Sequence, residues 1–192
     1  MLTSLSVHDS SFGWGCSILV LIAMGFLGVQ GPAQPPTQFE TQKLAPAEVA
    51  ASQYHGTSVA ISGSTIVSGV PIGVNGLNFT ASGSAYVHVF DSGSWVQQTK
   101  LSPSDGAWAD SFGASAAIDG DTVIVGASKH ILSAPTTSGA AYVFVRSGTA
   151  WVEQAKLSAF DGTVSDLFGQ FVAISGDTAV VGSPLWQDSS GN

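Results

Sequence analysis

Two pairs of aspartates have the residue type and spacing that a cation site needs. Asp105 and Asp110 are five residues apart, and Asp161 and Asp166 repeat the arrangement further along the chain. Two carboxylates at this separation are able to share a divalent cation. Aspartate also bonds the backbone of a glycine-containing turn, and such local bonds are common for this side chain. The sequence therefore favours a turn-forming role for the four carboxylates over a metal site.

The remaining residues with catalytic or ligand chemistry are scattered. The histidines are His8, His55, His88 and His130, and Cys16 is the one cysteine. No two of them stand at a spacing typical of zinc ligands. The sequence also contains no Gly-x-Ser-x-Gly elbow, no P-loop and no dinucleotide-binding glycine motif. We therefore predict no catalytic, no cofactor-binding and no metal-binding residues, and we expect the protein not to be an enzyme.

The composition excludes two further classes of protein. Five Lys and Arg stand against thirteen Asp and Glu, which gives a net charge of −8 over 192 residues. A chain without a basic patch is not suited to binding nucleic acid. Charged residues make up 9% and hydrophobic residues 44%, whereas disordered chains are rich in charged and poor in hydrophobic residues. With 23 glycines, this composition is typical of short strands joined by tight turns.

The N-terminal region predicts export from the cytoplasm. Residues 16–29 form an uncharged apolar run, which is shorter than the ~20 residues of a spanning helix. Gly31 and Ala33 supply small residues for cleavage after Ala33, so we predict a signal peptide over 1–33 and a Pro-rich linker over 34–37. The first fifteen residues lack Lys and Arg, so an uncleaved N-terminal anchor and a buried core helix remain alternatives. The expected location is secreted or cell surface, with membrane contact only through an uncleaved segment.

From residue 38 onward the sequence repeats itself. Lys43, Lys100 and Lys156 each precede a leucine at intervals of 57 and 56 residues, and Trp95 and Trp151 are also 56 apart. About two and two-thirds copies of a unit of ~56 residues therefore fill residues 38–192. A lysine repeated in every unit indicates a structural role, such as pairing with a nearby carboxylate.

Each unit predicts four strands. The third strand of the second unit is apolar on both faces, so its sheet must be covered on both sides. Four-stranded antiparallel sheets repeated at this period are the blades of a β-propeller. A β-solenoid is the alternative, but its repeats are usually much shorter. The predicted class is all-β, a partial β-propeller, with second-unit strands at Ser115–Ile118, Thr122–Val125, Ala140–Arg146 and Trp151–Leu157.

Short glycine motifs connect these units to a known family. Phe112-Gly113 is followed by Gly126-Ala127-Ser128, and Phe168-Gly169 is followed by Gly182-Ser183-Pro184. The first unit has the weaker His55-Gly56. The pattern resembles the FG-GAP repeat, the blade unit of integrin α-subunit propellers and of many secreted bacterial proteins. The resemblance covers residues 38–192 and implies a propeller, usually seven-bladed, that acts as an extracellular adhesion or binding scaffold.

The resemblance to the family does not extend to calcium binding. Many FG-GAP blades hold calcium in an Asp-rich hairpin loop, but here that hairpin is reduced to Ser62-Gly63-Ser64, Asp119-Gly120-Asp121 and Ser175-Gly176-Asp177. A calcium ion takes six to eight oxygen ligands, whereas a turn this tight offers one or two carboxylates. We therefore expect no cofactor, and calcium is only weakly supported.

The copy number is small for a closed ring. Seven units of this length would need about 390 residues, so we expect the chain to be a fragment or a truncated product. Phe39–Leu44 matches the fourth strand of a unit but has no first three strands before it. Our hypothesis is that it pairs with a C-terminal blade.

Partner contacts are expected where the units differ. Trp108, Trp186 and His130 do not recur, and all three lie in predicted loops. The loops over 72–82 and 128–138 also differ most between units. The function we predict is a protein- or glycan-binding adhesion module without catalysis. The alternative is a propeller hydrolase or lyase whose catalytic residues lie in a missing C-terminal region.

Overall fold

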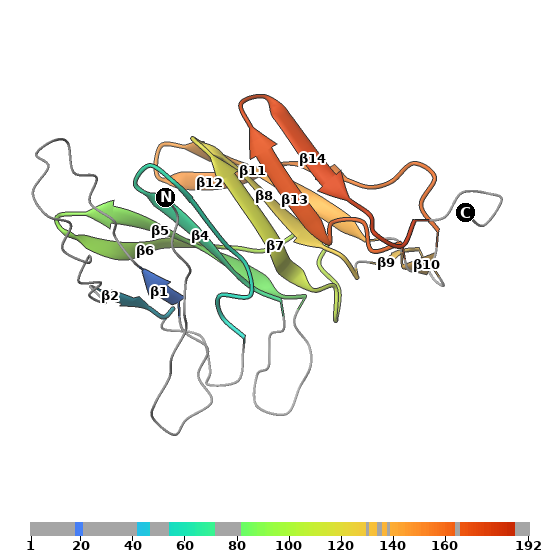
Figure 1. Ribbon diagram of the computed structural model, residues 1–192, viewed down its shortest axis with the longest axis horizontal. Coiled ribbons are helices and arrows are strands. Elements are labelled where there is room, and N and C mark those ends of the chain that lie inside the picture. The colour runs from blue at the N-terminus through green and yellow to red at the C-terminus, as the bar shows by residue number, and fades with distance from the viewer. Residues whose placement is uncertain are drawn as a thin grey trace, which may run out of the picture.

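The protein folds as a row of antiparallel β-sheets (Figure 1). The computed structural model describes residues 18–20, 42–46, 54–71, 82–129, 131–133, 136–137, 139–163 and 166–186. These residues form strands and turns and contain no helix, so none of them offers a helix with the length and hydropathy for crossing a membrane. The strands are β1 (Ile18–Val20), β2 (Gln42–Leu44), β3 (Val59–Ser62), β4 (Thr65–Val70), β5 (Ser84–Asp91), β6 (Ser94–Leu101), β7 (Phe112–Asp119), β8 (Thr122–Ala127), β9 (Ile131–Ser133), β10 (Thr136–Thr137), β11 (Ala140–Ser147), β12 (Ala150–Leu157), β13 (Phe171–Ser175) and β14 (Thr178–Gly182).

Two sheets are complete blades with the same strand order. Blade 1 is β3-β4-β5-β6, and blade 2 is β7-β8-β11-β12. Tyr86 pairs with Lys100 in blade 1, and Tyr142 pairs with Lys156 at the equivalent position of blade 2. Both third and fourth strands also share a register shift at equivalent positions. The predicted all-β class, the four strands of the first two units and the partial propeller are therefore confirmed.

The third unit and the N-terminal strands form two shorter sheets. β13 and β14 are the first and second strands of blade 3 and pair with each other. β2 pairs with β1 and lies beside β6, where Gln42 exchanges two hydrogen bonds of 2.7 Å with the backbone of Trp95. β1 falls within the predicted signal segment, whose other residues, like the linker at 34–37, lie outside the described residues. The small β9–β10 pair, inside the loop after β8, was not predicted.

The main core fills the space between blades 1 and 2. Val67 and Val87 of blade 1 face Phe112 and Tyr142 of blade 2, and all four side chains are buried. Phe112 packs edge-on against Tyr142, with ring centroids 5.6 Å apart. On β11, Tyr142 and Phe144 of one face are buried, whereas Val143 and Val145 of the other face are half-buried. The apolar pattern therefore predicts the coverage of both faces, and the coverage is more complete on the face of Tyr142.

Glycines let the inner strands of successive blades touch through their backbones. A Cβ on Gly69 would overlap the carbonyl oxygen of Gly113, and a Cβ on Gly126 would overlap that of Gly169. The same carbonyls accept hydrogen bonds from Ser58 Oγ at 2.8 Å and Ser115 Oγ at 2.7 Å. The two glycines of the sequence motif therefore meet at the same junction between blades. Gly69 and Gly126 belong to the earlier blade, and Gly113 and Gly169 belong to the later one.

The first hairpin turns of the three units also form a ladder. Gly120 N donates to Ser62 Oγ at 3.0 Å, and Gly176 N donates to Asp119 Oδ2 at 2.6 Å. The shortened hairpin that lacks a calcium loop therefore links each blade to the next.

Replacing Gly126 by alanine tests the junction. We expect Gly126→Ala to lower the free energy of unfolding by about 3 kcal/mol, because the added methyl must push two backbones apart. Thermal unfolding followed by circular dichroism measures the effect. Gly148→Ala is the control, since a Cβ there meets nothing within 4 Å and only the φ of 64° causes strain. Equal effects of the two substitutions would contradict the proposed junction.

Candidate functional site at the long-loop end

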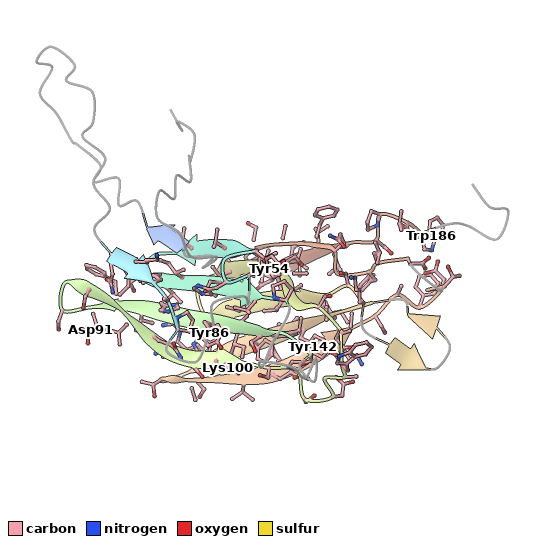
Figure 2. All side chains as sticks on the ribbon, turned by 90° about the horizontal axis from the view of Figure 1, so that it is seen from below. Tyr54, Tyr86, Asp91, Lys100, Tyr142 and Trp186 are labelled. Carbon is pink, nitrogen blue, oxygen red and sulfur yellow. The ribbon has the colours of Figure 1, made fainter. Side chains whose placement is uncertain are left out.

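The blades have two different ends because their strands are antiparallel. Turns between first and second strands and between third and fourth strands are tight, so all longer connections leave from the opposite end. We call this opposite end the long-loop end; its described residues are 54–58, 102–111, 128–129, 158–163 and 183–186. Figure 2 places Trp186 at one extreme of the molecule and Asp91, at a tight turn, at the other. Loops from all three units therefore lie at one end.

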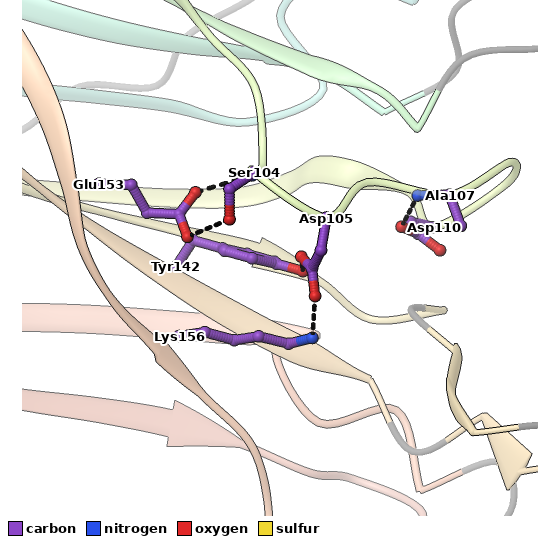
Figure 3. A network of polar contacts seen from close by, with 7 residues as sticks. All are labelled: Ser104, Asp105, Ala107, Asp110, Tyr142, Glu153 and Lys156. Carbon is purple, nitrogen blue, oxygen red and sulfur yellow. Dashed lines mark hydrogen bonds and ion pairs between the residues drawn. The ribbon is translucent and has the colours of Figure 1, made fainter.

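Asp105 fastens the loop after blade 1 onto blade 2. One carboxylate oxygen accepts a 2.8 Å hydrogen bond from the Tyr142 hydroxyl, and the other pairs with Lys156 Nζ at 2.5 Å (Figure 3). Ser104 adds two hydrogen bonds of 2.8 Å, from its backbone N–H and its hydroxyl, to Glu153. Burial, together with the hydrogen bond to Asp105, raises the pKa of Tyr142 above its usual range. Tyr142 is therefore a neutral hydrogen-bond donor at physiological pH.

Two of the repeated lysines, Lys100 and Lys156, have the structural role that the sequence predicts. Lys156 pairs with Asp105 and lies 5.7 Å from the ring centroid of Tyr142. Lys100 takes the same place over Tyr86 in blade 1, at 5.8 Å. A cation over an aromatic face contributes about 0.5–1 kcal/mol at exposed sites. These lysines hold the outer strands of each blade together.

Asp110 and Asp166 close their own loops. Each is buried, and its Oδ2 accepts a hydrogen bond from the backbone N–H three residues earlier, at Ala107 (2.6 Å) and Thr163 (2.5 Å). In Figure 3 the carboxylate of Asp110 turns back to Ala107, away from Asp105. Asp110 and Asp166 thus form the local turn bonds that the sequence favours, whereas Asp105 reaches across to Tyr142 and Lys156. The described part of the chain holds no group of three or more His, Cys, Asp or Glu with the arrangement of a metal site.

Large aromatic side chains are exposed at the long-loop end. Trp108 and Trp186, both predicted from the sequence, project from loops of different units, at 62% and 43% exposure. Tyr54 and Phe160 are also exposed there, and the sequence interpretation missed them. Phe160 stands where the preceding unit has Ser104, so the same search for non-recurring aromatics would have found it. His130, most of the loop at 72–82 and part of that at 128–138 lie outside the described residues.

The residue before each Phe-Gly or His-Gly pair has a left-handed backbone. Tyr54, Ser111 and Leu167 have φ of 43°, 60° and 58°. A positive φ is uncommon for these residue types and turns the chain sharply into the first strand. The three units share this turn although its side chain differs each time.

Blade 1 replaces a buried aromatic cluster with polar residues. His55, Ser68 and His88 stand where blade 2 has Phe112, Val125 and Phe144. His55 Nε2 lies 3.0 Å from Ser68 Oγ, and both histidines are buried. Neither Nδ1 atom has a hydrogen-bond partner within the described structure. Their place in the packing supports the interpretation of these histidines as packing variants.

Acid should destabilise the protein through this cluster. Burial lowers the pKa of His88 to about 4, and burial plus the nearby His88 lowers the pKa of His55 to about 4. The unfolded chain, with a pKa of about 6.5, then binds more protons, so stability is full above pH ~6.5 and falls as the pH drops to ~4. The loss is on the order of 3 kcal/mol for each histidine.

Urea unfolding across this pH range measures the predicted loss. The control combines His55→Phe, Ser68→Val and His88→Phe, which installs the residues of blade 2. This variant should show a much shallower dependence on pH. An unchanged slope would show that other groups cause the acid sensitivity.

The comparisons with known proteins agree with this architecture. The family model described as FG-GAP repeat matches three consecutive regions, residues 39–89, 95–144 and 151–192. A search of curated proteins finds no match. Each matched region begins one strand before a blade, so that the three run from β2 to β5, from β6 to β11 and from β12 to β14. Together they cover most of the chain, and the chain belongs to the FG-GAP repeat family.

Proposed function

We propose that the protein is a secreted or cell-surface binding module whose long-loop end contacts an extracellular protein or glycan. FG-GAP repeats form propeller-like modules that commonly serve binding and adhesion and are typically non-catalytic. The observation that supports the proposal is the set of exposed, non-recurring aromatics at one end of the blades. Exposed tryptophans and tyrosines are enriched at binding surfaces because they offer large contact areas at low entropic cost.

The neighbouring acidic groups favour a glycan among these partners. The Asp105 carboxylate remains half-exposed beside Lys156, and Asp161 is exposed in the next loop. Carboxylates accept hydrogen bonds from hydroxyl groups, and the apolar faces of sugar rings stack on aromatic side chains. The net charge of −8 disfavours acidic polysaccharides, so a neutral glycan fits best.

Loss of an aromatic side chain tests the proposal. Binding of the whole chain to an array of immobilised neutral oligosaccharides and extracellular matrix proteins identifies the partner. Trp108→Ala and Trp186→Ala should each weaken binding at least about tenfold, because a buried aromatic contact is worth roughly 2 kcal/mol. The measurement is biolayer interferometry on the partner that the array identifies.

Phe90→Ala serves as the matched control. Phe90 is an exposed aromatic next to the tight turn of β5–β6, at the opposite end of blade 1. The proposal predicts that its loss leaves binding unchanged. Equal loss in all three variants, or binding that survives both tryptophan substitutions, would count against the long-loop end as the contact surface.

A further inference from the structure

The segment 54–58 joins a buried histidine to an exposed tyrosine at the long-loop end. His55 is 1% exposed and takes the place that Phe112 has in blade 2, whereas Tyr54 is 59% exposed. The positive φ of 43° at Tyr54 turns the chain sharply between the two side chains. Because the residues are adjacent, His55 cannot leave its place in the packing without moving Tyr54. The position of an exposed aromatic side chain therefore depends on a buried ionisable group.

The hydrogen bonds around His55 suit a neutral ring. Ser68 Oγ lies 3.0 Å from His55 Nε2 and donates its own proton to the Tyr86 carbonyl oxygen at 3.5 Å. A hydroxyl has a single proton, so His55 Nε2 is the donor to Ser68, and His55 Nδ1 carries a lone pair. His55 Nδ1 and His88 Nδ1 are both buried, and neither has a hydrogen-bond partner within the described structure. A second proton on either ring would face no acceptor, which is costly for a buried group.

The strands around the two histidines provide no counter-charge for a protonated ring. Their ionisable residues are Lys43 on β2, Tyr86, His88 and Asp91 on β5, Lys100 on β6 and Asp119 on β7. Both aspartates lie at the tight-turn end, whereas His55 lies at the long-loop end. Tyr86 is edge-on to His55, with ring centroids 6.0 Å apart, and Lys100 lies over the Tyr86 ring. The charge that acts on His55 is that of His88, which disfavours protonation.

His55 is held less firmly than His88. His88 lies within β5 and pairs with strands on both sides, β4 and β6. His55 precedes the first residue of β3 and is therefore outside the ladder of blade 1. The next residue, Gly56, donates one backbone hydrogen bond of 3.0 Å to Gly69. Opening of the segment 54–58 thus breaks fewer backbone bonds than opening of the blade.

We propose that acid opens the segment 54–58 while the blades stay folded, because a protonated His55 finds its hydrogen-bond partners in water. The opening carries Tyr54 away from its place at the long-loop end, so that this end binds at neutral pH and releases its partner in acid. The release rests on the proposed function, whereas the opening concerns the chain alone.

The titration of His55 fixes the direction and the size of the effect. Burial, and to a smaller extent His88, lowers the pKa of the packed ring to about 4, whereas a ring in water has a pKa of about 6.5. The open segment therefore binds more protons than the closed one below pH ~6.5, and the gain ends near pH ~4, where the packed ring also titrates. Between pH 7 and pH 5 these two pKa values raise the opening constant about 20-fold.

Amide hydrogen exchange of the whole chain, read by mass spectrometry from pH 7 to pH 4, tests the opening. After correction for the intrinsic pH dependence of exchange, the protection of the Gly56 N–H should fall about 20-fold between pH 7 and pH 5. The amides of β8 should exchange more slowly at every pH, because they open only with the fold. Circular dichroism at each pH follows the blades. Gly56 protection that is independent of pH, or equal to that of β8 throughout, would overturn the proposal.

Two variants separate His55 from the other ionisable groups. His55→Phe combined with Ser68→Val installs the residues of blade 2 and should make the protection of Gly56 independent of pH. His88→Phe retains His55 and should keep most of the pH dependence. The reverse result would assign the effect to His88 and contradict the proposal. The pH series on the unsubstituted chain decides the matter alone if a substitution prevents folding.

Binding to the immobilised neutral oligosaccharides from pH 7 to pH 4 tests the release. An open fraction of one half doubles the apparent Kd. We therefore expect Kd to double at the pH where exchange gives an opening constant of one, and to do so only when His55 is present. An opening constant that stays far below one at pH 4, or an unchanged Kd where it reaches one, would overturn the release. No binding at pH 7 would contradict the proposed function instead, and the exchange result would still decide the opening.

Discussion

The close approach of a glycine to the carbonyl of the next unit is the constraint on which the rest of this fold depends. Gly69 and Gly126 leave no room for a side chain, because the oxygens of Gly113 and Gly169 occupy that space. Once the inner strands are this close, the hydroxyls of Ser58 and Ser115 reach the same oxygens. The spacing of the blades is thus set by backbone contact, and the apolar side chains fill what remains.

The loops follow from the same arrangement. Because tight turns occupy one end of each blade, the chain must cross between blades at the other end, where longer segments are available. Asp110 and Asp166 close these segments locally, whereas Asp105 reaches across to Tyr142 and Lys156. Asp105 and Asp110 lie in the same loop but have different roles. Asp110 shapes that loop, and Asp105 attaches it to the neighbouring blade.

Sequence periodicity was enough to predict the blades, but it was less informative about the loops. The repeated Lys, Trp and Gly positions fix strand order, because every unit must present the same side chains to the same neighbours. The roles of Asp110 and Asp166 were also predictable, since the bonds that they form are local. The contact of Asp105 with Tyr142 was not, because it joins residues 37 apart and depends on how two blades pack. Phe160 was overlooked although its failure to recur was visible.

The third unit differs from the first two at one residue of the junction. Ser58 and Ser115 donate to the glycine carbonyl of the following blade, and the equivalent residue of the third unit is Phe171. A duplicated copy of either of the first two units would carry both halves of the junction with it and could extend the row by repetition. A copy of the third unit would keep the glycine of the forward half, Gly182, but would lack the serine hydroxyl. The order of the units is therefore not interchangeable, and growth of the array by tandem duplication has a direction.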